Sequence, residues 1–252
     1  MEGMRRMLSY VRRCVDDYEM IHPQDKIAVG LSGGKDSLAL LVTLSELRRF
    51  YPHSFSLCAI TVDMGFSDGT DYHWVQELCD RLEVPFYIQT SQIAQVIFDV
   101  RKEHNPCSLC AKMRRGLLNR TATQLGYSKV ALGHHFDDVV ETFMLNLFQE
   151  GRLGTFSPVP YLSRTNVTVI RPMLYAPEKA ISYFVRKNQL PVVKSTCPAD
   201  GKTKREEMKL LLRQLERENK GLKHRIFHAM QKAGLDGLCM TKLKQKHDND
   251  LK

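Results

Sequence analysis

No stretch of about 18 consecutive apolar residues occurs in the chain, so the sequence lacks the pattern of a membrane-spanning helix. The first six residues lack the apolar core of a secretory signal peptide. Cysteine is present at seven positions, and an odd number without such a signal argues against a disulfide framework. Internal repeats and low-complexity linkers are also missing. We therefore expect a cytoplasmic protein with no membrane partner.

Acidic residues are in the minority, and the imbalance is uneven along the chain. The 252 residues carry a formal net charge of +9, and the segment from Gly201 to Lys252 holds 14 Lys and Arg against 7 Asp and Glu, a balance of +7. Such a basic segment suits a polyanion such as nucleic acid, although a solvated Lys-rich helical surface would show the same composition. We expect a domain over residues 1–200 and a basic helical extension over residues 201–252.

Short apolar runs alternate with amphipathic stretches along the first 200 residues. We expect strands at Lys26–Leu31, Ser56–Val62, Pro85–Gln89, Lys129–Leu132 and Val167–Ile170. We expect helices at Met4–Met20, Asp36–Arg48, Thr70–Leu82, Ala111–Leu125, Asp137–Gln149 and Pro177–Asn188. This alternation predicts an α/β fold, a doubly wound parallel five-stranded sheet in the order 3-2-1-4-5 with helices on both faces. After about Asp200 the pattern is helical only.

A glycine-rich turn follows the first expected strand and opens a helix. The residues are Ser32, Gly33, Gly34, Lys35, Asp36 and Ser37. Converging backbone N–H groups, two hydroxyls and a helix N-terminus make such a turn a site for phosphate, and a lysine there can neutralise a phosphoryl oxygen. The turn is not a Walker A loop, because Asp36 follows the lysine where Ser or Thr is required.

The pattern S-G-G-x-D-S directly after the first strand resembles the PP-loop of the ATP pyrophosphatases, the adenine nucleotide alpha hydrolase-like enzymes. The resemblance implies that ATP is cleaved between its α and β phosphates and that a carbonyl-type oxygen is adenylated.

A second polar cluster, Gly133-His-His-Phe-Asp-Asp138 with Glu141 and Thr142, follows the fourth expected strand. In the expected strand order it faces the same crevice as the phosphate loop. His and Asp at this spacing could bind a divalent metal directly, or the acids could position a nucleotide and its magnesium. The cluster resembles the second motif of tRNA-modifying PP-loop enzymes, which favours nucleotide binding. Arg171-Pro172 after the fifth strand resembles a third motif, with Arg171 placed to hold phosphate.

Three cysteines stand apart from the others. Cys107 and Cys110 form a C-x-x-C pair, and Cys197 follows 87 residues later. A lone C-x-x-C is compatible with zinc, with a redox dithiol or with no shared role, but three thiolates suit a [4Fe–4S] cluster with one iron left open. Cys14, Cys58 and Cys79 lie in apolar-periodic stretches and are expected to be buried.

The phosphate loop, the second motif, the C-x-x-C pair in the middle of the sequence and the late cysteine together resemble the tRNA 2-thiocytidine synthetase (TtcA) family. The resemblance covers roughly Arg5 to Ala233. It implies that Cys107, Cys110 and Cys197 hold a [4Fe–4S] cluster and that sulfur is transferred to a tRNA pyrimidine, cytidine 32 in that family. The late segment here, Thr196-Cys-Pro, lacks the second cysteine that well-known members carry.

The hypothesis of an ATP-dependent tRNA sulfurtransferase also assigns roles to individual residues. ATP and Mg²⁺ join the cluster as cofactors, with magnesium near Asp36 and Asp138 and adenine near Val62 and Asp63. The expected catalytic residues are Lys35, Asp36 and Asp138; the expected ATP contacts are the loop residues 32–37 with Val62, Asp63, Gly133, His134, Asp137 and Arg171; and the expected tRNA contacts are Lys202, Lys204, Arg205 and Lys209. The expected partners are tRNA and a sulfur donor such as a cysteine desulfurase, and a homodimer is an open alternative to a monomer.

Two other hypotheses fit parts of the sequence. A sulfur-free PP-loop ligase of the tRNA-Ile lysidine synthetase type would explain both nucleotide motifs but would leave the three cysteines without a role. A redox-sensing nucleic-acid binder would use the cluster as a signal and would leave the phosphate loop idle.

Overall fold

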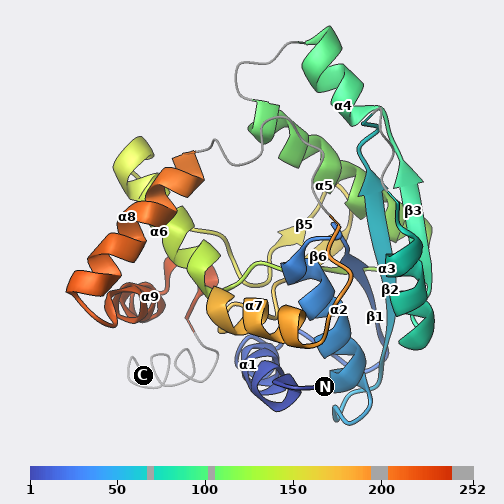
Figure 1. The fold of residues 1–252 in the computed structure, drawn as a ribbon, viewed down its shortest axis with the longest axis horizontal. Helices are drawn as coiled ribbons and strands as arrows, with labels where there is room; N and C mark the ends of the chain where they lie inside the picture. Colours follow the sequence, from blue (N-terminus) through green and yellow to red (C-terminus); the bar gives the residue numbers. More distant parts are fainter. Residues whose placement is uncertain (67–70, 102–105, 194–203, 240–252) are drawn as a thin grey trace.

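A computed structural model of the chain describes residues 1–66, 71–101, 106–193 and 204–239 (Figure 1). Within these residues one sheet has the order β3-β2-β1-β4-β6-β5. Its strands are β1 Asp25–Gly30, β2 Phe55–Asp63, β3 Phe86–Thr90, β4 Lys129–Ala131, β5 Tyr161–Leu162 and β6 Val167–Ile170.

The five expected strands are present, parallel and in the predicted order, so the fold prediction is confirmed. The sequence analysis missed β5, which pairs antiparallel with β6 at the edge of the sheet. Two residues are too short to show a period of two, so the sequence gives no signal for this strand.

Helices cover both faces of the sheet (Figure 1). The α-helices are α1 Met4–Asp17, α2 Lys35–Arg48, α3 His73–Arg81, α4 Ile93–Gln95, α5 Pro106–Gln124, α6 Phe136–Glu150, α7 Glu178–Lys187, α8 Lys204–Glu218 and α9 Leu222–Lys232. A π-helical turn, Val96–Val100, and a 3-10 turn, Leu235–Gly237, complete the described elements. None of the described helices is long and apolar enough to cross a membrane.

Alternation along the strands divides the core into two layers. Ile27 and Val29 of β1 pack in the larger cluster with α1, α2, α3 and α7, whereas Ala28 between them packs in the smaller cluster with Leu118 and Ala122 of α5. Successive side chains of a strand point to opposite faces, so β1 contributes to both layers.

Helix α2 lies in the middle of the larger layer. Its residues from Ser37 to Ser45 are all buried, so it is enclosed on every side. Polar side chains in this run form hydrogen bonds, as when Thr43 Oγ1 donates to the carbonyl oxygen of Ala39 at 2.7 Å. A helix enclosed in this way has a fixed position, and its first residue, Lys35, belongs to the phosphate loop.

The C-terminal helices pack against α6 and share its core. Met208 and Leu212 of α8, Phe227 and Met230 of α9, and Leu238 belong to the same buried cluster as α2 and α6. The expected helices after residue 203 are therefore present and contribute apolar side chains to the larger layer. The division into domains at residue 200 stays a prediction.

We expect Leu212→Ala to reduce the free energy of unfolding by about 2–5 kcal/mol, because the side chain is fully buried and its removal leaves a cavity. The matched control is Leu210→Ala in the same helix, where the side chain is 57% exposed and the expected change is about 0.5 kcal/mol or less. Urea unfolding of both variants measures the difference. Equal effects would contradict the packing of α8 into the core.

Candidate active site

Hydrogen bonds of Ser32 and Ser37 fix the shape of the phosphate loop. Ser32 Oγ and Ser37 Oγ lie 3.2 Å apart, and the backbone N–H of Gly34 donates to Ser32 Oγ at 3.3 Å. Ser37 Oγ in turn donates to the carbonyl oxygen of Gly34 at 2.9 Å. These bonds tie the end of β1 to the first turn of α2. The loop therefore has a defined shape at a helix N-terminus, the position at which phosphate binds most readily.

Two glycines allow other segments to approach this loop closely. Gly33 has a φ of +77°, and a Cβ there would lie 2.8 Å from the Cβ of Val193. The N–H of Val193 donates to the carbonyl oxygen of Gly33 at 3.0 Å, so the segment after α7 contacts the loop. Gly133 packs against the first turn of α2, where an added Cβ would lie 3.0 Å from the carbonyl carbon of Asp36. The phosphate loop and the second motif are therefore in backbone contact.

Lys35 lies between two carboxylates. Its Nζ is 2.9 Å from Asp36 Oδ2 and 3.3 Å from Glu178 Oε1 at the start of α7. Burial lowers the pKa of Lys35, but these two carboxylates outweigh it and raise the pKa above its ordinary value. Lys35 is therefore a permanent positive charge at the entrance to the phosphate loop.

Glu178 is shared by two lysines. Its Oε1 lies 2.7 Å from Nζ of Lys209 on α8 as well as 3.3 Å from Nζ of Lys35. Burial raises the pKa of Glu178, but the two ammonium groups prevail and lower it to about 2. Glu178 therefore links the phosphate loop to the C-terminal helices.

The second motif begins α6 with a capping box formed by His135 and Asp138. The N–H of Asp138 donates to Nδ1 of His135 at 3.4 Å, and the N–H of His135 donates to Asp138 Oδ2 at 2.9 Å. The other ring nitrogen of His135 lies 3.8 Å from Asp36 Oδ1. His135 thus lies between the acid of the phosphate loop and the acid of the second motif.

Cations from α8 and α9 pair with both aspartates of this motif. Asp138 Oδ1 accepts a hydrogen bond from Arg205 Nη1 at 3.1 Å, and Arg205 Nη2 donates to Thr142 Oγ1 at 3.1 Å. Asp137 Oδ1 lies 2.7 Å from Nζ of Lys223, and Asp137 Oδ2 accepts the N–H of Glu178. Burial raises the pKa of Asp137, but Lys223 and this N–H lower it overall.

His134 and Arg171 form a second contact across the site. Arg171 Nε donates to His134 Nδ1 at 3.3 Å, and the guanidinium carbon lies 4.9 Å from the ring centroid of Phe156. Burial together with Arg171 lowers the pKa of His134 to about 4, so its ring is neutral at neutral pH. Burial and the nearby Arg115 lower the pKa of Arg171 to about 10, and it stays charged. A neutral ring can accept the guanidinium N–H without repulsion.

Two buried carboxylate oxygens among the described residues have no hydrogen-bond partner: Asp36 Oδ1 and Glu141 Oε1. Burial, with Asp138 as the next cause, raises the pKa of Glu141 to about 7. Carboxylate oxygens without a proton donor suit a hard cation such as Mg²⁺. The acids of α2 and α6 therefore fit a magnesium ion in their chemistry.

The expected adenine contacts lie at the end of β2. Asp63 is the last residue of this strand; its carbonyl oxygen accepts a hydrogen bond from Ser91 Oγ at 2.6 Å, and its side chain accepts one from the N–H of Gly65 at 3.1 Å. Val62, the preceding residue, packs against the smaller core cluster. These residues occupy the carboxyl end of a strand next to β1, the edge at which ligands bind in such sheets.

Cys107 and Cys110 lie within α5 rather than before it. The helix was expected from Ala111, but it begins at Pro106, because a proline is well tolerated in the first turn. The two cysteines are therefore one turn apart, with Cys107 exposed and Cys110 half-buried. Cys197 and Lys202 lie outside the described residues. In the part of the chain that the structure describes, no group of three His, Cys, Asp or Glu side chains forms a metal site. Cys14, Cys58 and Cys79 are buried as expected.

Sequence reasoning missed Glu178, Lys223 and Val193 as members of the site. An acid in the first turn of a helix is an ordinary preference, so Glu178 carries no signal of its own. Lys223 is one of many basic residues after Gly201. All three are recognised as site residues only because they contact the phosphate loop or the second motif, and these contacts form only in the tertiary fold.

Comparisons with known proteins identify the family. A PP-loop domain family matches residues 6–215. The tRNA-cytidine(32) 2-sulfurtransferase of Pelobacter propionicus is 42% identical over 217 residues, which cover 85% of this chain and 80% of the relative. That of Geobacter sulfurreducens is 38% identical over 229 residues, with coverages of 90% and 89%. This chain belongs to the tRNA-cytidine(32) 2-sulfurtransferase family.

A solved structure agrees with this assignment. The U34-tRNA thiolase NcsA from Methanococcus maripaludis, with its [4Fe–4S] cluster, has a TM-score of 0.76 and 27% identity over 92% of this chain and 78% of its own. The family resemblance expected from the sequence is confirmed. The relatives named here are sulfurtransferases, so they favour sulfur transfer over the sulfur-free ligase and the redox sensor.

The pH dependence of stability tests the burial of Glu141. A folded-state pKa of about 7, above the ordinary 4.5, means that the folded chain binds the proton more tightly than the unfolded chain. The wild type therefore loses this contribution to stability as the pH rises from about 4.5 to about 7.

We expect Glu141→Gln to remove this dependence. The melting temperature of the variant relative to the wild type should rise between pH 5 and pH 8. Glu150→Gln, at the exposed end of α6, is the matched control and should show no such trend. If the difference in melting temperature between Glu141→Gln and the wild type did not change with pH, the buried environment assigned to Glu141 would be contradicted.

Proposed function

We propose that the chain is an ATP-dependent tRNA sulfurtransferase that adenylates the 2-oxo group of cytidine 32 and replaces its oxygen with sulfur. The observation that supports this most is the backbone contact between Gly133 and the first turn of α2. It brings the phosphate loop and the acidic motif together in a chain of the tRNA-cytidine(32) 2-sulfurtransferase family.

The triphosphate of ATP would lie on the phosphate loop. The N–H groups of residues 32–37, the two serine hydroxyls and Lys35 would bind its oxygens, and Arg171 would hold a further phosphate oxygen. Adenine would rest near Val62 and Asp63 at the neighbouring strand. Gly133, His134 and Asp137 would line the opposite side of the nucleotide.

Adenylation then follows from this arrangement. The O2 atom of the cytidine attacks the α phosphorus, the bond to the bridging oxygen breaks and pyrophosphate leaves. Lys35 and the loop N–H groups stabilise the negative charge on the phosphoryl oxygens as it develops. Attack of a sulfur nucleophile on C2 of the ring then expels AMP, so that the pyrimidine oxygen leaves with the phosphate and sulfur takes its place.

Magnesium would be held by Asp36 and Asp138, with Glu141 three residues after Asp138 on the same helix. The unpartnered oxygen of Asp36 supports this placement. Arg205, which donates to Asp138, would have to move if the ion takes that oxygen. When bound, magnesium neutralises phosphate charge next to Lys35.

Cys107, Cys110 and Cys197 would hold the [4Fe–4S] cluster. The chemistry of the donor set fits, because the first two thiols are one helical turn apart and accessible. Val193, directly before segment 194–203, contacts Gly33, and Arg205, the second residue after it, contacts Asp138. When bound, such a cluster supplies an iron at which inorganic sulfur can be held.

Further parts of the proposal concern partners. Lys202, Lys204, Arg205 and Lys209 are proposed tRNA contacts, a cysteine desulfurase is the proposed sulfur source, and the reaction is placed in the cytoplasm. A homodimer is the proposed alternative to a monomer.

Nucleoside mass spectrometry tests the proposed function: tRNA from cells with the gene should contain 2-thiocytidine, and tRNA from cells without it should not. Thiolation at another base would overturn the choice of cytidine.

Lys35→Ala should reduce formation of AMP from ATP in the presence of tRNA by roughly 100-fold or more, because the charge that stabilises the transferring phosphoryl group is lost. Lys26→Ala is the matched control. Lys26 is exposed near the start of β1, whereas the phosphate loop follows the end of this strand. Release of AMP and pyrophosphate measures both. Wild-type turnover in Lys35→Ala would contradict the loop assignment.

Single Ala substitutions at Cys107, Cys110 and Cys197 should each remove most of the iron from anaerobically purified protein, because all three thiolates are needed to hold one cluster. Each should leave ATP binding unchanged, since the phosphate loop is a separate element. Cys79→Ala, a buried thiol on α3, is the control and should retain iron. Iron content and the visible absorption spectrum are the measurements. Full iron content in any of the three variants would exclude that residue as a ligand.

A further inference from the structure

The solvent side of α1 carries a stripe of arginines. Arg5, Arg6, Arg12 and Arg13 are all exposed, while the buried side of the helix consists of Met7, Val11, Cys14 and Val15. The two arginine pairs are seven residues apart, about 10 Å along a helix. Each pair can therefore meet a different phosphate of an extended strand.

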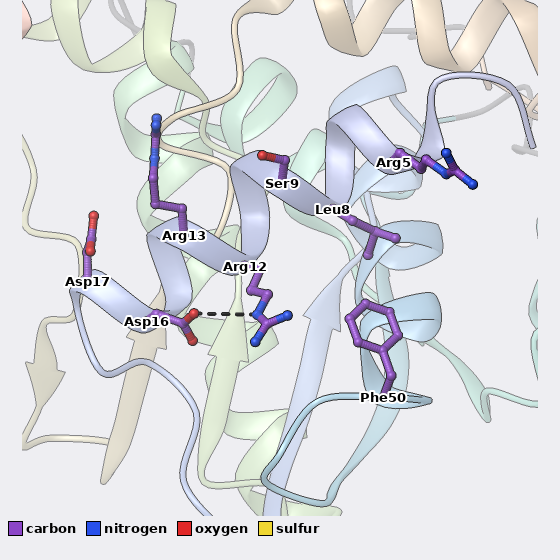
Figure 2. A pocket seen from close by; sticks show the side chains of 8 residues that line it. All are labelled: Arg5, Leu8, Ser9, Arg12, Arg13, Asp16, Asp17 and Phe50. Atoms are coloured by element: carbon purple, nitrogen blue, oxygen red, sulfur yellow. Dashed lines mark ion pairs between the residues drawn. The ribbon is translucent and has the colours of Figure 1, made fainter.

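A hollow of about 520 Å³ lies on one side of this stripe (Figure 2). Arg5, Leu8 and Arg12 line it together with Phe50, which is 52% exposed. In Figure 2, Arg12 and Phe50 point to the same side of α1 and Arg13 points away from them. An exposed aromatic ring beside guanidinium groups offers both a stacking surface and positive charge.

A second hollow, of about 420 Å³, lies between α1 and α9. Phe136, Tyr175 and Phe227 supply aromatic rings, and the Arg13 guanidinium lies 4.7 Å from the ring centroid of Tyr175. The exposed side chains of His224 and His228 complete the wall on α9. The stripe therefore has an exposed aromatic ring on one side, at Phe50, and exposed histidines above buried aromatic rings on the other.

The acids beside the stripe already have partners. Asp16 accepts a hydrogen bond from Tyr51 Oη at 2.8 Å and lies 3.6 Å from Arg12 Nε. Asp17 accepts one from Tyr175 Oη at 3.0 Å. These bonds hold the two carboxylates at the end of α1, where both line the first hollow and Asp17 also lines the second, while Arg5 and Arg6 lie at its start.

On α1, Arg12 faces Asp16, whereas on α8 three cations face carboxylates, two of them at the active site. Arg205 binds Asp138, Lys209 binds Glu178, and Lys204 lies 3.0 Å from Glu207. A polyanion at α8 must compete with these acids for each cation. The excess of positive charge after Gly201 is therefore partly neutralised by the active site itself.

We infer that the groove formed by α1, α9 and Phe50 is the surface on which the tRNA substrate docks. The arginines contact phosphates in the bidentate manner that a guanidinium favours, and the exposed ring of Phe50 takes an unstacked base. The second hollow is lined by Phe136 and Pro177, which are next in sequence to His135 and Glu178 of the site, whereas Phe50 of the first hollow follows the far end of α2. The inference rests on the proposed function, which supplies the RNA.

The test compares two double variants of the full-length protein that each remove two positive charges. Arg5→Ala with Arg13→Ala removes charge from the groove. Arg81→Ala with Arg164→Ala is the control, because both residues are exposed, at the end of α3 and next to β5. Unmodified tRNA transcript is titrated against each protein between 50 and 200 mM salt, and ATP binding is measured in parallel.

We expect the groove variant to bind tRNA about tenfold more weakly at 150 mM salt, with the slope of log Kd against log salt reduced by about 1 to 2. The control should differ from the wild type by about twofold or less, and ATP binding should be unchanged in both. Equal weakening in the two variants, or none in either, would overturn the docking surface. If the groove variant kept the tRNA affinity of the wild type but had a different molecular mass in solution, the groove would instead be a contact surface for a second copy of the protein.

The wild-type protein separates failure of this inference from failure of the proposed function. A wild type that binds tRNA and forms AMP, together with an unaffected groove variant, refutes only the surface. A wild type that binds no tRNA refutes both.

Discussion

The burial of α2 from Ser37 to Ser45 is the constraint on which the site depends. An α-helix buried on every side cannot shift without opening cavities in a close-packed core. Its N-terminus therefore holds the phosphate loop at one place, and the other parts of the site are positioned relative to it. Gly133 approaches its backbone, Val193 bonds to the loop, and Glu178 reaches Lys35 from α7.

The neighbouring position of β1 and β4 in the sheet makes these approaches possible. In the order β3-β2-β1-β4-β6-β5 the direction of strand addition reverses at β1 and β4. Loops after these strands leave the same edge and diverge, which opens a crevice there. The phosphate loop follows β1 and the acidic motif follows β4, so the topology alone brings them together. This explains why two motifs about 100 residues apart act on one nucleotide in the proposed reaction.

Much of this arrangement could be predicted from local sequence. Buried strands of β-branched residues, helix starts and the glycine turn each have a local pattern, and parallel topology follows from their alternation. Glu178, Lys223 and Val193 could not be predicted, because their roles come from contacts with residues far away in the sequence. The start of α5 at Pro106 was missed for a local reason, since Pro106 and Cys107 carry no apolar period of their own.

The distribution of charge shows how far composition can guide function. Counting residues assigned the positive excess to the segment after Gly201 and suggested RNA contacts there. In the folded protein, Arg205, Lys209 and Lys223 from that segment are counter-ions of acids at the nucleotide site. Their charge stabilises one buried and two half-buried carboxylates, and the same carboxylates weaken their attraction for a distant polyanion. The four arginines of α1 are partly offset by Asp16 and Asp17, so that the helix carries a balance of +2, but they lie together on one exposed face. For an RNA-binding protein the local arrangement of charge therefore indicates the docking surface better than the segment with the largest excess.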